Sequence, residues 1–227
     1  MSWVKERITI LIMSTPESSS RYGHVICTAG ITEDNEWRRL WSITPQIKKK
    51  YKIKRWDIIE TNVRTTNDQR IETRKIDPES IKNYAHIQDW NHKNIIEGIA
   101  DNSLDDITNA GRSIGILKPN IKRLKLIPST TKDDKSFGKV FPKYHFKCDI
   151  QCSMCSSQYA YHKMKCRDWG SNVLCRKVKN KPNGNDIIKQ KLLDDMKNKF
   201  DTWFGVGTHR RWQTWMIVAL FWFTKNV

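Results

Sequence analysis

Residues 24–43, HVICTAGITEDNEWRRLWSI, contain the pattern that decides how the N-terminal part of the chain folds. Two segments rich in β-branched and aromatic residues, His24–Gly30 and Glu36–Ile43, flank the polar residues Glu33-Asp34-Asn35. Strand-forming segments on either side of a short polar turn are typical of a β-hairpin. The stretch therefore predicts two antiparallel strands joined by a turn.

Further strands are predicted on both sides of this hairpin, at residues 5–13 and 53–63, where isoleucines are frequent. A basic connector, residues 47–51, precedes the second of them and contains Lys48, Lys49 and Lys50. A meander of this kind can close into a small barrel, and closure is favoured because it removes unpaired sheet edges.

The middle of the chain favours short helices. Ser103 is a candidate N-cap, with Asp106 at the capping-box position and Gly111 as the stop signal. The segment 121–127 alternates apolar and basic residues, which predicts a strand with Lys122 and Lys125 near solvent. The other predicted elements are helices at Pro78–Tyr84, Asp89–Ala100 and Asp186–Phe200, and strands at Val140–Lys147, Thr202–Val206 and Trp215–Phe223.

This order of strands, helices, strands, one more helix and a final strand pair is typical of an α+β protein. We predict a β-barrel-like domain at residues 1–77 and a helical connector with one strand at 78–136. A Cys-rich, mixed α/β domain is predicted at 137–227.

The chain has 41 Lys and Arg against 24 Asp and Glu, a formal net charge of +17. Such a surface attracts polyanions, of which nucleic acid is the commonest. The alternative is a lysine-rich composition without a polyanionic partner. Interleaving of arginine with aromatic residues favours nucleic acid.

The apolar run at Trp212–Phe223 is interrupted by Gln213 and Thr214 and is far shorter than the roughly 20 residues that cross a bilayer. The N-terminal residues do not read as a secretory signal. We therefore expect a cytoplasmic protein without a membrane partner, in a reducing compartment that disfavours disulfides.

Five of the six cysteines lie between Cys148 and Cys175. Zinc takes four thiolate or imidazole ligands in a tetrahedron, and this segment predicts a structural zinc site. Its candidate ligands are Cys148, Cys152, Cys155, His162 and Cys166. The alternative is a group of small buried thiols, because free cysteine packs as an apolar residue. An iron–sulfur site is rejected on position, because only 72 residues follow Cys155 and they show no repeated βα units.

Two basic segments are candidate nucleic-acid contacts. In the first, alternation places Trp37, Arg39 and Trp41 on one face of a strand and Arg38 on the other. Arginine beside tryptophan suits phosphate contact and base stacking. In the second, Gly205–Arg211, glycines let backbone amides approach a ligand. The full candidate set is Trp37, Arg38, Arg39, Trp41, Lys48, Lys49, Lys50, His209, Arg210 and Arg211. The alternative is that the tryptophans are core residues and the cations are solvated.

Several stretches give the chain a family resemblance: VICTAGI at 25–31, EWRRLW at 36–41, KRWDIIE at 54–60, HKMKCRDW at 162–169 and VGTHRRWQTWMIVALF at 206–221. With these the chain resembles uncharacterised bacterial proteins that have dual OB-type domains. The chain departs from the family pattern in two ways. Ala219 stands where the pattern has glycine, and Cys152 and Cys155 give the cysteine segment more cysteines than the pattern has. The resemblance implies barrel-like lobes and nucleic-acid binding, and it implies no named activity.

The leading hypothesis is a nucleic-acid-binding accessory protein, non-enzymatic on its own, that binds DNA or RNA within a larger complex with protein partners and contains a zinc site. One alternative is a nuclease or base-modifying enzyme that uses His162, Asp168 and His209 as acid–base groups. Another is a protein-interaction scaffold with an acidic partner.

Overall fold

A computed structural model describes residues 2–19, 22–128, 144–151, 155, 161–178, 180–209 and 214–225. The chain divides into two compact units. Unit 1 comprises Met1–Ile99 with Ala110–Ser113, and unit 2 comprises Ala100–Asn109 with Ile114–Val227. Among the described helices, none combines the length and the apolar character needed to cross a bilayer.

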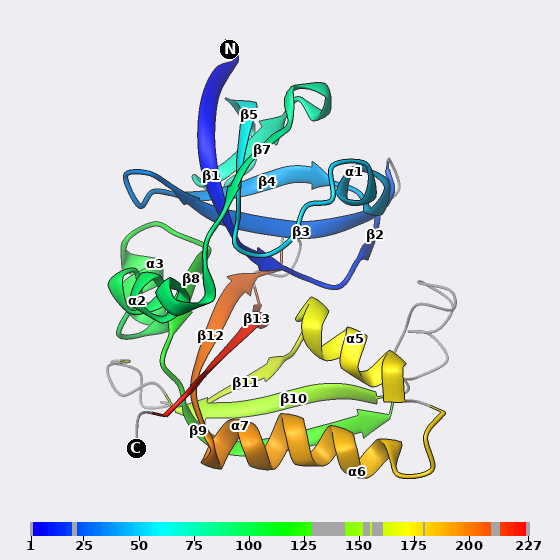
Figure 1. The fold of residues 1–227 in the computed structure, drawn as a ribbon. Helices are drawn as coiled ribbons and strands as arrows, with labels where there is room; N and C mark the ends of the chain where they lie inside the picture. Colours follow the sequence, from blue (N-terminus) through cyan, green and yellow to red (C-terminus); the bar gives the residue numbers. More distant parts are fainter. Residues whose placement is uncertain are drawn as a thin grey trace. The chain divides into compact units, whose positions relative to one another are not determined.

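Unit 1 is built around a closed ring of strands, drawn in blue to cyan in Figure 1. β1 pairs with β3, β3 with β4, β4 with β6, β6 with β5, and β5 returns to β1. The β4–β6 pairing is parallel and the others are antiparallel. The elements are β1 Val4–Met13, β2 Glu17–Ser19, β3 Gly23–Thr32, β4 Trp37–Ile43, α1 Pro45–Lys50, β5 Asp57–Thr65, β6 Thr73–Ile76, η1 Pro78–Ser80, β7 Lys82–His86 and α2 Asp89–Gly98.

The connectivity of this ring is that of an OB-type barrel. In chain order, the five strands of the ring are β1 (1), β3 (2), β4 (3), β5 (4) and β6 (5). Around the ring, neighbouring strands pair in the order 1-2-3-5-4-1. A helix, α1, lies between the third and fourth members, β4 and β5. The predicted barrel is therefore confirmed for unit 1.

Alternating apolar side chains fill the barrel. Ile8, Ile10 and Ile12 of β1 are fully buried, as is Ile59 of β5. Gly30 lets β1 and β3 approach, since a Cβ there would lie 1.9 Å from the carbonyl oxygen of Thr9. The close approach gives a physical reason for glycine in the VICTAGI stretch.

In the part of unit 2 that the structure describes, the strands form two three-stranded sheets, β11-β10-β9 and β13-β12-β8. β8 and β9 are nearly continuous in the chain, and a parallel bridge between Cys166 and Ile217 joins the ends of β11 and β13. Its elements are α3 Leu104–Asn109, β8 Ile114–Leu117, β9 Asn120–Pro128, β10 Tyr144–Gln151, β11 Tyr161–Lys165, α5 Trp169–Val178, α6 Gly184–Lys189, η3 Gln190–Asp195, α7 Met196–Asn198, β12 Phe200–Thr208 and β13 Trp215–Thr224.

These pairings repeat the order seen in unit 1. If β8 and β9 are counted as one bent first strand, the ring runs through β10, β11, β13 and β12 and back to β8. The third and fifth members again contact in parallel, and helices α5 to α7 again lie between the third and fourth. The strand order of unit 2 is therefore also OB-like.

One core fills unit 2, between the strands and the helices that flank the lower sheet in Figure 1. Its helical members include Ile188, Leu192 and Met196, which lie four residues apart on the helix that the sequence predicted at Asp186–Phe200. The predicted helix nevertheless ends earlier than expected, at Asn198, because Phe200 already pairs in β12.

Two other expected elements differ from the structure. Residues 45–50 form helix α1 rather than a connector, with the Thr44 hydroxyl accepting a hydrogen bond from Ile47 N at 3.2 Å. The predicted helix at 78–84 is a 3₁₀ turn followed by strand β7, which pairs with β5. Tertiary pairing here outweighs the local helix signal.

Candidate nucleic-acid interface

A row of three lysines crosses the β9–β10–β11 sheet of unit 2. Lys147 of β10 is directly opposite Lys165 on one side and Lys125 on the other. Residues opposite each other in such a sheet have Cβ atoms about 4.5–5.5 Å apart. Lys125 and Lys165 are exposed and Lys147 is half-buried. The row therefore presents three ammonium groups on one sheet face.

The opposite face of the same sheet belongs to the core. Cys148, Ile150 and Met164 alternate with the lysines and are at most 1% exposed. This alternation fixes the direction of the lysines, because side chains in a strand point to opposite faces in turn. Like charges directly opposite each other destabilise a sheet. The row therefore has an electrostatic cost that a bound anion would relieve.

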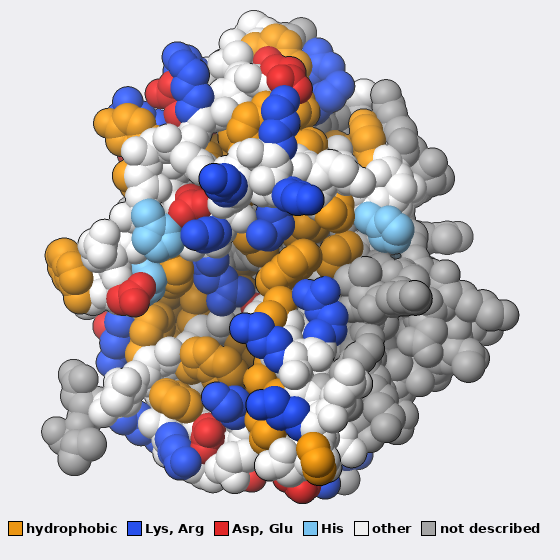
Figure 2. Space-filling view, turned by 45° about the vertical axis from the view of Figure 1, so that its right-hand side comes forward, with side chains coloured by type: hydrophobic (Ala, Val, Ile, Leu, Met, Phe, Trp, Pro, Cys, Tyr) orange, Lys and Arg blue, Asp and Glu red, His pale blue; other side chains and the backbone are white. Residues whose placement is uncertain are grey.

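Two residues further along the strands, the same face carries Lys163 opposite Asp149. Lys163 is exposed, and Asp149 is half-buried. Lys122, also exposed, lies at the β-bulge of β9. Lysines and arginines also far exceed acidic side chains over the molecular face drawn in Figure 2.

Arg39, expected to contact phosphate, is buried in unit 1. Its side chain is 5% exposed, and Nε lies 3.7 Å from Glu72 Oε1. Its Nη2 donates to the Ser113 carbonyl at 2.9 Å and to the Ser113 hydroxyl at 3.0 Å. Ser113 in turn donates through its N–H to Glu72 at 3.1 Å. The expectation for Arg39 is wrong, because this buried network occupies the guanidinium.

Trp37 and Arg38 also lack the expected exposure. Trp37 is 6% exposed, which leaves little ring surface for a base. The Arg38 guanidinium lies 2.9 Å from Glu6 and 2.5 Å from Glu36. Burial opposes the charge of Arg38, but hydrogen bonds to these two carboxylates outweigh it and raise the pKa. Both residues therefore support the barrel rather than a ligand.

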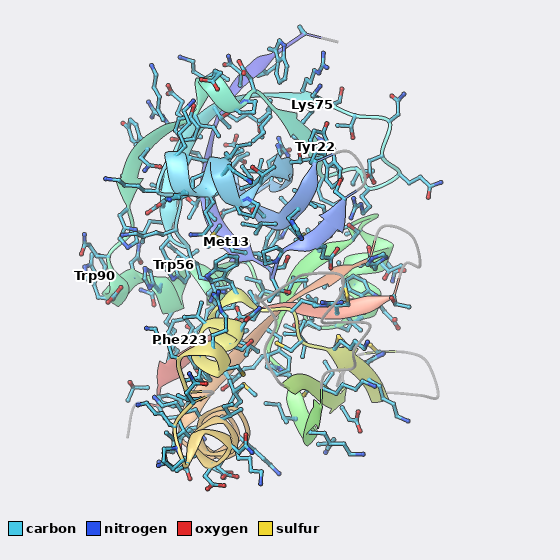
Figure 3. The ribbon with its side chains drawn as sticks, turned by 90° about the vertical axis from the view of Figure 1, so that its right-hand side faces the viewer. Met13, Tyr22, Trp56, Lys75, Trp90 and Phe223 are labelled. Carbon is cyan, nitrogen blue, oxygen red and sulfur yellow. The ribbon has the colours of Figure 1, made fainter. Side chains whose placement is uncertain are left out.

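Trp41 is the tryptophan of this strand that remains partly accessible. The Tyr22 ring meets it edge-on, with centroids 6.1 Å apart and planes at 80°. Lys75 of β6 is the strand partner of Trp41. Figure 3 shows Tyr22 and Lys75 in the same part of unit 1. An aromatic pair beside a lysine is the composition of a base-stacking platform.

The lysines at 48–50 form the last turn of α1, where the helix dipole favours positive charge. Lys50 Nζ lies 2.8 Å from Glu79 Oε2, and burial lowers the pKa of Lys48.

In the β12–β13 hairpin the His209 N–H donates to the Thr214 carbonyl at 3.0 Å. Arg210 and Arg211 lie outside the described residues.

The structure divides the candidate zinc ligands into two groups. His162 Nε2 lies 3.4 Å from Cys155 Sγ. Cys166 is four residues along extended chain from His162, about 13 Å at 3.3 Å per residue. Ligands of one zinc ion lie within about 2.3 Å of it, so Cys166 and His162 do not share one. Cys152 lies outside the described residues, among which no group of three or more candidate metal-binding side chains converges.

Cys148, Cys166 and Cys175 instead belong to the apolar core of unit 2. Burial raises the pKa of the Cys166 thiol to about 12 and that of Cys175 to about 11. Burial likewise raises the pKa of Cys148. Neutral thiols in apolar surroundings are typical of packing residues.

Asp168, the candidate acid–base group, is 3% exposed. Its carboxylate accepts hydrogen bonds from the Ser171 N–H at 2.7 Å and the Leu220 N–H at 3.2 Å. It therefore holds the start of α5 against β13, which is a structural role.

Sequence reasoning missed the lysine row, Tyr22 and Lys75. The signal for the row was present, because lysines alternate with apolar residues in RLKLI, FKCDI and HKMKC. The register that aligns them across three strands is a tertiary property.

Comparisons with known proteins describe the domains without assigning an activity. A crystal structure titled tetrameric p202 HIN2 aligns over 100% of this chain and 96% of its own, with 8% identity and a TM-score of 0.32. That likeness is weak. No curated protein matches the sequence significantly. Residues 4–98 match Domain of unknown function (DUF8758), and residues 116–227 match Domain of unknown function (DUF8757).

Proposed function

We propose that the protein binds nucleic acid through the outer face of β9–β10–β11. The observation that carries the proposal is the alignment of Lys125, Lys147 and Lys165 across three adjacent strands. Three neighbouring ammonium groups match the repeated charge of a phosphate backbone. β10 and β11 are the second and third strands of their ring, and that face of OB folds binds oligonucleotides.

Unit 1 contributes base stacking in this proposal. Trp41 and Tyr22 offer aromatic surface, and Lys75 offers a phosphate contact beside them. Stacking on an aromatic side chain is sequence-tolerant, because every base has a π-face. We therefore expect a preference for single strands, with limited sequence specificity.

The decisive experiment compares two triple variants by fluorescence anisotropy with labelled single-stranded DNA, duplex DNA and RNA. One replaces Lys125, Lys147 and Lys165 by Gln. The matched control replaces Lys189, Lys191 and Lys197, which are exposed on the α6–α7 helix, and changes the net charge equally.

For single strands, each lost phosphate contact should make the slope of log affinity against log salt concentration shallower by about 0.7. The row variant loses three such contacts, so its slope should be shallower by about 2. The control variant should keep the wild-type slope. Equal effects in the two variants would refute the assignment of the row. Wild-type binding that ignores salt between about 50 and 200 mM would refute electrostatic binding altogether.

Stacking is tested by Trp41→Ala, which should weaken single-strand binding by about 1–3 kcal/mol and leave duplex binding unchanged. The control is Trp90→Ala, because Trp90 is 79% exposed and projects from α2 into solvent (Figure 3). A loss of equal size in both variants would contradict a specific platform.

We also propose a structural zinc ion at Cys155 and His162, together with Cys152. The 3.4 Å separation of Cys155 Sγ and His162 Nε2 supports it, since two ligands of a tetrahedral zinc lie about 3.5 Å apart. Elemental analysis should find zinc in the wild type and in Cys175→Ala, and none in Cys155→Ser. A folded wild-type protein without metal would end this proposal.

The role proposed for the chain is that of a non-enzymatic accessory subunit in a nucleoprotein complex. The structural use of Asp168 removes one of the three acid–base groups of the enzymatic alternative, which leaves His162 and His209 as its candidates. Incubation with single- and double-stranded substrates and Mg²⁺ should leave them intact, and cleavage or base conversion lost in His162→Ala would overturn the role.

A further inference from the structure

Unit 1 has a recess of about 400 Å³ between helix α2, the middle of β1, and the end of β3 with the turn that follows it. Its lining residues all belong to unit 1. Ligand pockets in proteins typically measure about 300–1,000 Å³. This recess therefore fits a single small molecule or one base with its sugar.

Among the described residues, the lining of the recess contains no Lys, Arg or His, in a chain whose net charge is +17. The charged side chain among these lining residues is Glu33, whose Oε1 lies 3.5 Å from Arg7 Nη1. A phosphate group would meet this acid, and no cation belongs to the described lining. The recess is thus chemically unlike the lysine row of unit 2.

Asn35, Asn91 and Asn94 are among the lining residues, and so are Thr9 and Thr32. A side-chain amide has both an N–H₂ donor and a carbonyl acceptor, and a threonine has a hydroxyl group. Isoleucines from β3 and α2 supply apolar surface beside them. Paired donors and acceptors next to apolar surface suit a flat heterocycle with mixed polar edges.

We propose that this recess binds an adenine base. Adenine presents an acceptor and a donor side by side at N7 and N6, and the side-chain amide of asparagine complements both at once. The base reaches the recess either in a free nucleoside or as an unpaired base of a bound strand. The proposal requires no contact with the lysine row.

Gly98 provides a sharp test. It lines the recess at the last turn of α2, and a Cβ built there meets nothing within 4 Å. A leucine at this position can therefore enter the recess without displacing backbone. The matched control is Glu97→Leu, the adjacent exposed position of the same helix, which is not part of the lining.

Adenosine and cytidine are titrated into wild type and variants by isothermal titration calorimetry. Wild type and Glu97→Leu should bind adenosine at least tenfold more tightly than cytidine. Gly98→Leu should weaken adenosine binding at least tenfold, and Asn91→Ala severalfold. Thermal unfolding of each variant checks that the fold is intact.

A second arm separates the two sources of the base. Oligothymidylate with one central adenine is compared with the same strand carrying an abasic site. If only the strand supplies the base, Gly98→Leu should abolish the preference for the adenine strand, while free adenosine binds neither protein. A wild-type protein that binds neither adenosine nor the adenine strand selectively would overturn the proposal, as would a folded Gly98→Leu variant that binds like wild type.

Failure of this proposal is distinct from failure of the proposed function. The Lys125→Gln, Lys147→Gln, Lys165→Gln variant should keep wild-type affinity for adenosine, because the nucleoside has no phosphate. Loss of adenosine binding in that folded variant would contradict the independence of the two sites.

Discussion

Replacing Arg39 with methionine should destabilise unit 1 rather than specifically weaken ligand binding. The change removes the guanidinium from a buried cluster in which the Glu72 side chain is 2% exposed. It also removes the hydrogen bonds of Arg39 to Ser113 and its contact with Cys27 Sγ at 3.0 Å. Glu72 would then remain as an uncompensated buried carboxylate.

Breaking a buried ion pair by removing one partner typically costs about 3–5 kcal/mol. Among the described residues, Arg39 Nε and Glu72 Oε2 have no hydrogen-bond partner, so the pair is imperfectly satisfied. We therefore expect the lower half of this range, about 3–4 kcal/mol. For a domain of about 100 residues, 1 kcal/mol shifts the unfolding temperature by about 4–8 °C, so the total shift is at least about 12 °C.

The assay is urea denaturation of the full chain, followed by circular dichroism and tryptophan fluorescence. The double variant Arg39→Met, Glu72→Leu should be less destabilised than the sum of its single variants, because it removes both buried charges together. An Arg39→Met protein with wild-type unfolding and strongly reduced nucleic-acid affinity would refute the reasoning and restore Arg39 as a phosphate contact.

Three further substitutions test other features of the fold. Gly30→Ala should cost about 1–3 kcal/mol or more in denaturant unfolding, because its Cβ would lie 1.9 Å from Thr9 O. Gly98→Ala is the control, because a Cβ at position 98 meets nothing within 4 Å. Equal free energies of unfolding in Gly30→Ala and Gly98→Ala would contradict the clash at Gly30. Ser103→Ala should cost about 1 kcal/mol by loss of the 3.0 Å cap to Asp106 N, measured by thermal unfolding, with recovery in Ser103→Asp. Burial lowers the pKa of His92 in the folded protein below its usual value of 6.5. As the pH falls below 6.5, the unfolded chain binds a proton at His92 more readily than the folded protein does, so the free energy of unfolding decreases. His92→Phe should make that decline shallower, and an unchanged pH profile would exclude the contribution.

Local chemistry determined much of the fold. The hairpin at 24–43 was confirmed because its strands and turn have strong local signals. The cap at Ser103 was confirmed by the hydrogen bond to Asp106 N, and Gly111 has the left-handed φ of 69° that favours glycine after a helix. The spacing of Ile188, Leu192 and Met196 placed a helix against the core. The predicted helix at 78–84 failed because β7 pairs with residues of β5 that lie more than 20 residues earlier in the chain.

The candidate interface was less predictable, because it depends on what each side chain faces. Sequence by itself determined the basic surface, the barrel-forming strands and the unusual density of thiols. It did not distinguish Arg39, which pairs with Glu72 in the interior, from Lys147, which faces out of the sheet. Only the tertiary structure decided that Lys125, Lys147 and Lys165 stand side by side. The physical reason is register: strand alternation is local, but the alignment of one strand with its neighbours is set by the packing of the whole barrel.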